Sequence, residues 1–158
     1  MPEIQASITI AAPPSKVWEK LMDLSSWPQW NTFVTSIQVE TPDQQLSVGS
    51  KQIIHIRPNP KKPESTEAYS NVVTEITPHQ KLVWEGSLGS SLVFNTEHWC
   101  KLEPVAGQNG DSKSTLFTQG ERFSGLLAPV VGLTGKLKQL EEGYIRMNGH
   151  LKQVMEAV

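Results

Sequence analysis

The amino-acid sequence predicts an α+β fold, in which a curved, antiparallel, seven-stranded sheet, two short helices and a long C-terminal helix enclose a cavity. Three observations carry this prediction. The chain has 158 residues, the usual length of one domain, so we expect residues 1–158 to form a single domain. Its middle alternates between β-branched or aromatic segments and short turns, which is typical of consecutive antiparallel strands. Residues 133–158 repeat apolar side chains at helical spacing.

The first strand is predicted over residues 4–10, where apolar and polar residues alternate with the period of two that marks a half-buried strand. Pro14 then favours the first turn of a helix, and apolar residues at helical spacing continue to Leu24. A short second turn carries Trp27 and Trp30. The sequence therefore predicts a strand followed by two short helices.

Six further strands are predicted, separated by gaps that contain turn residues such as proline, glycine, asparagine and aspartate. They are expected at Thr35–Glu40, Lys51–Arg57, Thr66–Thr77, Lys81–Ser87, Leu92–Glu103 and Ser114–Phe123. Gaps this short indicate sequential hairpins, which form a meander. The inward face of the strand that carries Trp84 is not fixed by its pattern.

The last segment is predicted to be one long helix, because its apolar residues follow alternating steps of four and three. These residues are Leu133, Leu137, Leu140, Tyr144, Met147, Leu151, Val154 and Val158. Two interpretations stay open, a coiled-coil seam and a helix packed on the sheet. We favour the second, since the sheet would otherwise leave one face bare. Gly132 and Gly143 would share a face of this helix, which indicates flexibility or the close approach of a neighbour.

Composition and charge exclude several classes of protein. The chain is 37% hydrophobic and 19% charged, unlike disordered tails. With 14 Lys and Arg against 16 Asp and Glu it has no basic surplus, so no nucleic-acid partner is expected. The single cysteine predicts no disulfide and the four scattered histidines predict no metal, while the lack of a complete phosphate loop or dinucleotide fingerprint predicts no cofactor. No segment has the ~20 apolar residues of a membrane helix, and no signal peptide is visible, so we expect a cytoplasmic protein without stable membrane insertion.

Several motifs, together with the order of elements, resemble a known superfamily. They are Ile8–Trp18 (ITIAAPPSKVW), Asp23 with Trp27–Trp30, Leu82–Trp84, His98–Pro104 and Gln119–Leu127. In these motifs the chain resembles the START-like, or SRPBCC, superfamily. Its helix-grip fold is shared by the birch pollen allergen, polyketide cyclases/dehydrases and lipid-transport proteins. The resemblance covers essentially the whole chain and implies an internal ligand cavity. It implies no single activity, because the same frame hosts binders, carriers, cyclases and chaperone cofactors.

The most interesting pair of side chains is His98 and Glu121. A hairpin centred near Asn109 places them opposite each other on the inner face of neighbouring strands. An imidazole beside a carboxylate in an apolar cavity can act as acid and base. The same pair can equally be a hydrogen-bonded structural element or an anchor for the polar end of a ligand, and these two interpretations are favoured.

We therefore expect a protein that binds or carries a small hydrophobic or amphipathic ligand, such as a lipid, a polyketide-like molecule or an isoprenoid. The candidate ligand-binding residues are Trp30, Phe33, Phe94, His98, Phe117, Glu121, Leu133, Leu137 and Tyr144. The alternatives are a cyclase or dehydratase that uses the His–Glu pair, and a chaperone-cofactor-like domain that uses an apolar patch on the outer sheet face. A homodimer is compatible with the sequence. Ser124–Leu133 is expected to be a mobile gate or an ordinary connector.

Overall fold

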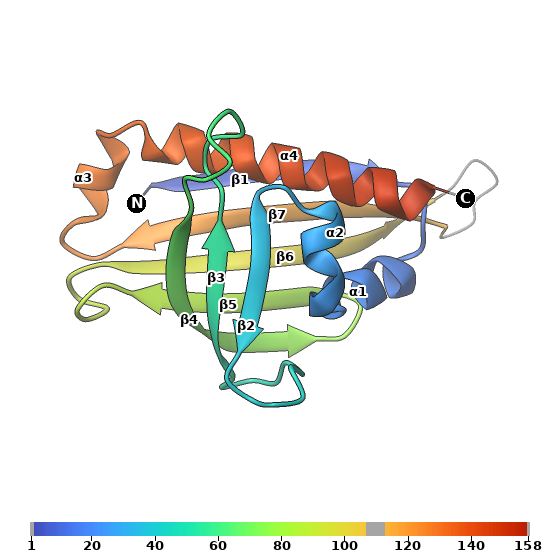
Figure 1. Cartoon of the computed structure of the whole chain (residues 1–158). Helices are drawn as coiled ribbons and strands as arrows, with labels where there is room; N and C mark the ends of the chain where they lie inside the picture. The colour runs from blue at the N-terminus through green and yellow to red at the C-terminus, as the bar shows by residue number, and fades with distance from the viewer. Residues whose placement is uncertain (1, 107–112, 158) are drawn as a thin grey trace.

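The structure is a computed structural model that describes residues 2–106 and 113–157 (Figure 1). In this part of the chain, seven strands form one antiparallel sheet in the order β1-β7-β6-β5-β4-β3-β2. The strands are β1 (Glu3–Ile10), β2 (Val34–Val39), β3 (Lys51–Ile56), β4 (Glu67–Thr77), β5 (Lys81–Ser87), β6 (Asn95–Val105) and β7 (Ser114–Ser124). The helices are α1 (Pro14–Met22), α2 (Trp27–Trp30), α3 (Ala128–Gly132) and α4 (Lys136–Glu156), with a 3₁₀ turn at Leu24–Ser26. The predicted α+β architecture and meander are confirmed.

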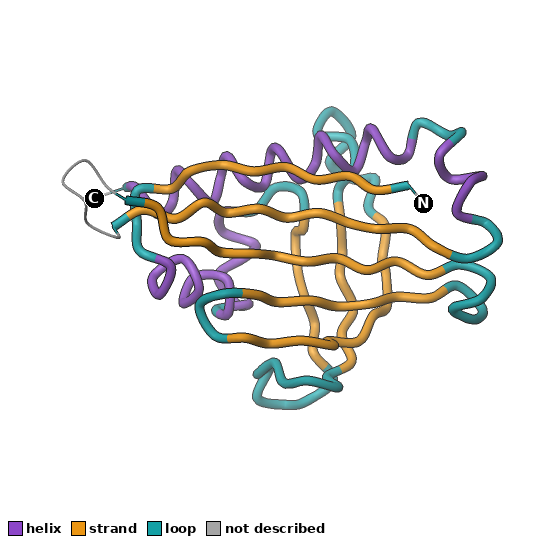
Figure 2. Tube along the Cα trace, turned by 180° about the vertical axis from the view of Figure 1, so that it is seen from behind, coloured by secondary structure: helices purple, strands orange, loops and turns teal. Residues whose placement is uncertain are grey.

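The sheet bends sharply within β4. The first half of β4, Glu67–Val72, pairs with β3, whereas its second half, Val72–Thr77, pairs with β5. The register shifts between Val73 and Glu75, which marks a bulge, and bulges bend strands and increase their twist. As a result β2 and β3 run steeply across the direction of β5, β6 and β7 (Figure 2). This bend makes the sheet concave toward α4.

Helix α4 lies along β1 and crosses the concave side of the sheet (Figure 1). Its buried face consists of Leu140, Gly143, Tyr144, Met147, Asn148 and Leu151. The apolar stripe of this helix therefore packs on the sheet, which is the interpretation that we favoured over a coiled-coil seam. Val158, the last residue of that stripe, lies outside the described residues.

The predicted helix begins too early. Residues 128–132 form the separate short helix α3, and turn hydrogen bonds from the amides of Leu133 and Thr134 to the carbonyls of Val130 and Val131 separate it from α4. Gly132 and Gly143 therefore do not share a helix face, contrary to the prediction. The strand bounds are right to within three residues, the largest difference being the start of β6 at Asn95 instead of Leu92. There the chain is still in a turn, in which the Val93 amide donates to the Ser90 carbonyl.

Gly143 allows α4 to approach the ring of Phe33, the residue that precedes β2. A Cβ atom at this position would overlap the Phe33 ring, which is itself only 1% exposed. Phe33 also packs edge-on against Tyr144, with 5.4 Å between ring centroids. The close approach that the sequence indicated for Gly143 is therefore present, and it fixes the distance between α4 and the α2–β2 corner.

We predict that Gly143→Ala destabilises the fold. Overpacking against a buried ring costs about 1–3 kcal/mol and should exceed the gain of up to about 1 kcal/mol that alanine brings to a helix interior. Gly149→Ala is the matched control, since nothing lies within 4 Å of a Cβ at that position of the same helix. Urea unfolding should show lower stability for G143A and equal or higher stability for G149A. A G143A protein as stable as G149A would contradict the close-packing argument.

Candidate functional site

A cavity of about 540 Å³ lies between the concave face of the sheet and α4. Its walls come from β2–β7, α2, α3 and α4, and most of them are apolar or aromatic. The aromatic members are Trp27, Phe33, Tyr69, Trp84, Phe94, His98, Phe123 and Tyr144. The cavity reaches the surface near Leu88 and near Tyr69, two lining residues that are 65% and 45% exposed. A concave, largely apolar space with a few polar groups is the usual form of a small-molecule site.

The first set of polar residues at this cavity is a buried chain of hydrogen bonds that begins at His98. The imidazole stacks on the Trp84 indole, with 4.3 Å between ring centroids and 14° between planes. Its Nε2 lies 3.1 Å from Oε1 of Gln119, and Gln119 Nε2 donates in turn to Oδ1 of Asn148 at 2.6 Å. Because Gln119 presents its carbonyl oxygen, His98 must carry its proton on Nε2. Nδ1 is then an acceptor, buried and without a partner among the described residues.

Burial lowers the pKa of His98 to about 4, although the hydrogen bond to Gln119 acts in the opposite direction. The imidazole is therefore neutral at pH 7. A neutral ring stacked flat on tryptophan behaves as part of the aromatic wall. It is not a cation that could hold an anionic ligand.

The second polar group is Glu121, which accepts a hydrogen bond from the Tyr144 hydroxyl at 3.0 Å between Oη and Oε2. Burial raises the pKa of Glu121 to about 7, against the opposing effects of that hydrogen bond and of the Lys136 charge. The carboxyl group is therefore divided between its acid and its carboxylate form near neutral pH. It can donate a hydrogen bond into the cavity in the first form and accept a proton in the second.

A third polar group bridges α4 and β4 at the side of the cavity. The Lys136 ammonium contacts both carboxylate oxygens of Glu67, and the Tyr69 hydroxyl donates to Oε2 of the same carboxylate at 2.7 Å. Lys136 and Tyr69 also line the cavity. This cluster ties the start of α4 to the bent strand, at the side where the sheet turns away from the helix.

The predicted register of His98 and Glu121 is confirmed, since the two residues are direct partners in the β6–β7 ladder. Their predicted contact is wrong, because each side chain has another partner. His98 leans toward Trp84 of β5 and Gln119 of β7, and Tyr144 of α4 takes the carboxylate. The ring centroids of Tyr144 and His98 are 5.1 Å apart, so the helix residue stands beside both.

Five of the nine predicted ligand-binding residues line the cavity: Phe33, Phe94, His98, Glu121 and Tyr144. The other four do not. Trp30 and Phe117 are buried in the core, and Leu137 packs against it. Phe117 has the inward orientation that was predicted, but it lies toward the end of the sheet that α1 covers, beyond the cavity. Leu133 is 88% exposed, because the chain turns between α3 and α4.

Two residues that line the cavity, and one that pairs with the lining residue Gln119, were missed or left open by the sequence. Trp84 was unassigned because Leu82, Val83 and Trp84 are all buried and so show no alternation to interpret. Lys136 carries no sequence signal of a cavity position, because it lies outside the apolar stripe predicted for this helix. The same applies to Asn148, whose polar side chain lies on the buried face of α4.

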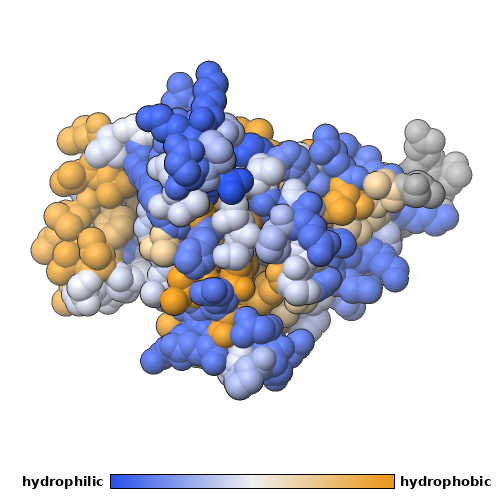
Figure 3. Space-filling model, viewed as in Figure 1, coloured by the Kyte–Doolittle hydropathy of each residue, from blue (hydrophilic) through white to orange (hydrophobic). Residues whose placement is uncertain are grey.

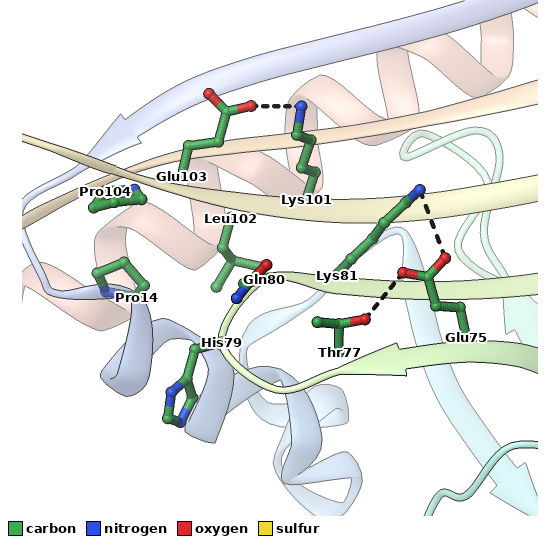
Figure 4. Close-up of a pocket in the computed structure, with 10 residues that line it drawn as sticks. All are labelled: Pro14, Glu75, Thr77, His79, Gln80, Lys81, Lys101, Leu102, Glu103 and Pro104. Carbon is green, nitrogen blue, oxygen red and sulfur yellow. Dashed lines mark hydrogen bonds and ion pairs between the residues drawn. The ribbon is translucent and has the colours of Figure 1, made fainter.

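The structure also has a surface groove of about 490 Å³ at the start of α1 and the β4–β5 turn (Figure 4). Its charged side chains pair with one another: Lys81 Nζ lies 3.7 Å from Glu75, and Lys101 Nζ lies 2.7 Å from Glu103. The Thr77 hydroxyl donates to Glu75 at 3.0 Å. Because these charges neutralise each other at the solvent boundary, the interior cavity is the better candidate site.

Among residues 2–106 and 113–157, no three His, Cys, Asp or Glu side chains are close enough together to hold a metal ion. Within the same residues, no helix has the length and apolar character needed to span a bilayer.

A family model described as polyketide cyclase/dehydrase and lipid transport matches residues 1–156. The chain belongs to this family. The resemblance noted in the sequence is thereby confirmed, and it extends over both walls of the cavity, from β1 to α4.

Among curated proteins, the oxopyrrolidines biosynthesis cluster protein O of Penicillium oxalicum is 38% identical over 82 residues. The match covers 46% of the present chain and 40% of the fungal protein, so the chain matches less than half the length of that relative.

Several solved structures share the fold of the present chain at low sequence identity. A hypothetical protein from Helicobacter pylori aligns with a TM-score of 0.74 and 14% identity, over 98% of this chain and 88% of that one. The Zhui aromatase/cyclase from Streptomyces sp. R1128 aligns with a TM-score of 0.70 and 12% identity, over 98% and 93% of the two chains. At these identities the likeness shows the fold alone, a curved seven-stranded sheet with a long C-terminal helix.

The separate partners of His98 and Glu121 lead to a prediction about proton binding. In an NMR titration, His98 should stay neutral well below the ordinary histidine pKa of 6.5 and begin to titrate near pH 4. In Glu121→Gln its pKa should be unchanged, because burial and, to a smaller extent, the hydrogen bond to Gln119 set it, not Glu121. A clear fall of the His98 pKa in the variant would show that the two side chains are coupled after all, and a His98 pKa near 6.5 in the unmodified protein would contradict the effect of burial.

Proposed function

We propose that this protein binds a small, largely aromatic or apolar ligand in the cavity, with a carbonyl or hydroxyl oxygen of the ligand at Glu121 and Tyr144. The single observation that carries the proposal is the Glu121–Tyr144 pair in a wall that is mostly apolar and aromatic. Apolar burial supplies affinity, since transfer of apolar surface from water contributes about 25 cal/mol per Å². The polar pair orients the ligand, because a buried oxygen without a partner would cost about 1–3 kcal/mol.

The chemistry of the walls indicates the class of ligand. Stacked and tilted rings, among them Trp84, His98 and Phe94 with Phe123, favour flat, conjugated molecules over flexible alkyl chains. Neutral His98 and a half-protonated Glu121 favour a neutral oxygen over an anionic head group. Within the range of lipids, polyketide-like molecules and isoprenoids, these features support a polyketide-like aromatic molecule. Membership in a family named for polyketide cyclases and dehydrases supports the same choice.

A second candidate function is cyclase or dehydratase catalysis, and the titration range of Glu121 is the observation that favours it. A carboxylate with a pKa of about 7 can remove a proton from a carbon next to a ketone. The resulting carboxylic acid can return that proton to a hydroxyl that leaves as water. Tyr144 would position the ketone oxygen. The fold likeness to an aromatase/cyclase is consistent with this function but does not distinguish it from binding.

The pH dependence of binding tests the proposed role of Glu121. The probe is flavone, a neutral aromatic ketone without a titrating group, and binding is followed by quenching of tryptophan fluorescence. Protonated Glu121 can donate to the ketone and the carboxylate cannot, so affinity should fall as pH rises through about 7. Between pH 6 and pH 8 the loss should be about tenfold, because the protonated fraction of a group titrating near 7 falls by that factor.

Glu121→Gln should remove this pH dependence, since its amide does not titrate. Glu97→Gln is the matched control: it is the same substitution one residue before His98 on β6, where Glu97 does not line the cavity. E97Q should follow the unmodified protein. If flavone fails to bind, or if the pH dependence persists in E121Q, the proposed ligand orientation is wrong. For the catalytic alternative, turnover of a polyketone substrate should be lost in E121Q while binding is retained.

A further inference from the structure

The largest exposed apolar feature of the described residues is at one end of the molecule, which we call the apolar tip (Figure 3). It is formed by the loop between β5 and β6 and by the segment from the end of β7 through α3. Its exposed side chains are Leu88, Leu92, Val93, Leu126, Leu127, Val130 and Leu133. Three of them are among the most exposed residues of their kind: Leu92 at 79%, Leu126 at 81% and Leu133 at 88%. A group of seven exposed apolar side chains at one end of a protein marks an interaction surface.

Backbone hydrogen bonds join the two segments of the apolar tip. The amides of Leu126 and Leu127 donate to the carbonyls of Leu92 and Val93 at 3.1 and 2.9 Å. Gly125 makes this contact possible: it has a φ of +94°, and a Cβ there would lie 2.7 Å from the Val93 carbonyl oxygen. The segment predicted as a gate is thus tied to its neighbour with its leucines facing outward. Whether it moves stays a prediction.

The apolar tip carries no charge. Residues 86–96 and 123–135 contain no Asp, Glu, Lys, Arg or His. Protein–protein interfaces normally surround an apolar centre with a polar rim, and these two segments offer only serine, threonine and asparagine side chains for one, without a charged group. Apolar side chains, no charge and internally paired backbone groups are instead the properties that the boundary of a lipid bilayer favours.

The apolar tip is continuous with the cavity. Leu88 belongs to both, Val131 of α3 lines the cavity next to exposed Val130, and Phe94 lines it next to exposed Val93. A hydrophobic ligand that passes between the cavity and this end of the molecule would therefore stay in contact with apolar side chains. On a bilayer, such a ligand could move between membrane and cavity without crossing water.

We propose that the apolar tip docks reversibly on the surface of a phospholipid bilayer, with its leucine and valine side chains in the interfacial region. This is peripheral binding, which needs no membrane-spanning segment. The inference goes beyond the proposed function, since docking depends on the exposed side chains and not on the ligand. Its failure would leave the flavone experiment unaffected.

Co-flotation with vesicles of pure phosphatidylcholine tests the proposal. The unmodified protein should float with the vesicles, and Leu126→Glu/Leu133→Glu should reduce the bound fraction at least about tenfold, because two leucines no longer leave water and two charges resist insertion. Val48→Glu/Ile145→Glu is the matched control. These two residues are 64% and 56% exposed, and neither belongs to the apolar tip. The control should float like the unmodified protein.

Three results would overturn the proposal. The first is that the unmodified protein does not float. The second is that both double variants lose flotation equally, which would mean that any exposed apolar residue contributes. The third is that sedimentation velocity shows a dimer that only L126E/L133E converts to monomer, without flotation. The apolar tip would then be an interface between two copies of the chain. Thermal unfolding of both variants, whose changes are all at exposed positions, checks that they fold.

Discussion

A straight helix cannot stay in contact with a sheet that bends, and the cavity is the space left by this mismatch. The bend is in β4, which pairs with β3 along one half and with β5 along the other. Helix α4 follows β1 on one side, and at Gly143 it touches the Phe33 ring on the other. Between these supports the sheet turns away. The cavity therefore depends on the bulge between Val73 and Glu75, and on Gly143, which sets the distance between α4 and the Phe33 ring.

The polar groups inside this space follow from the same geometry. A helix that crosses a concave sheet presents Tyr144 and Asn148 to buried groups on strand β7, and Lys136 to a partly exposed carboxylate on β4. Each buried polar group must then be paired or made neutral. Gln119 and Asn148 form such a pair, and His98 is held neutral beside them. Glu121 keeps a carboxyl group that titrates near pH 7, which gives the aromatic wall its one adjustable hydrogen-bonding group.

Much of the fold could be predicted from the sequence, because sheet and helix patterns are local. Alternation in β1 and the turn residues between strands were sufficient for the meander. Hairpin register alone placed His98 opposite Glu121. By contrast, the hydrogen-bond partners of these two side chains could not be predicted, since they depend on where α4 lies over the sheet. The sequence pattern of α4 shows which residues face inward but not which strand each one reaches, so the Tyr144–Glu121 contact was missed.

Other differences have equally local physical causes. Leu133 fits the helical spacing, yet turn hydrogen bonds after α3 end that helix, and the leucine lies on the surface. Phe117 faces inward as alternation requires, but alternation does not say how far along a strand the cavity extends. Trp84 was undecided because three consecutive buried residues carry no alternation. These residues show that the pattern of a strand predicts which side chains face the interior. Predicting a binding site also requires the position of the helix that lies across from the strand.

A crystal structure of the protein with bound flavone would test the central claim most directly. The account predicts the flat ligand between the sheet and α4, in contact with Trp84 and Phe94, and its ketone oxygen within hydrogen-bonding distance of Glu121 or Tyr144. A solidly packed interior, or flavone bound only in the surface groove between Glu75 and Lys101, would contradict it.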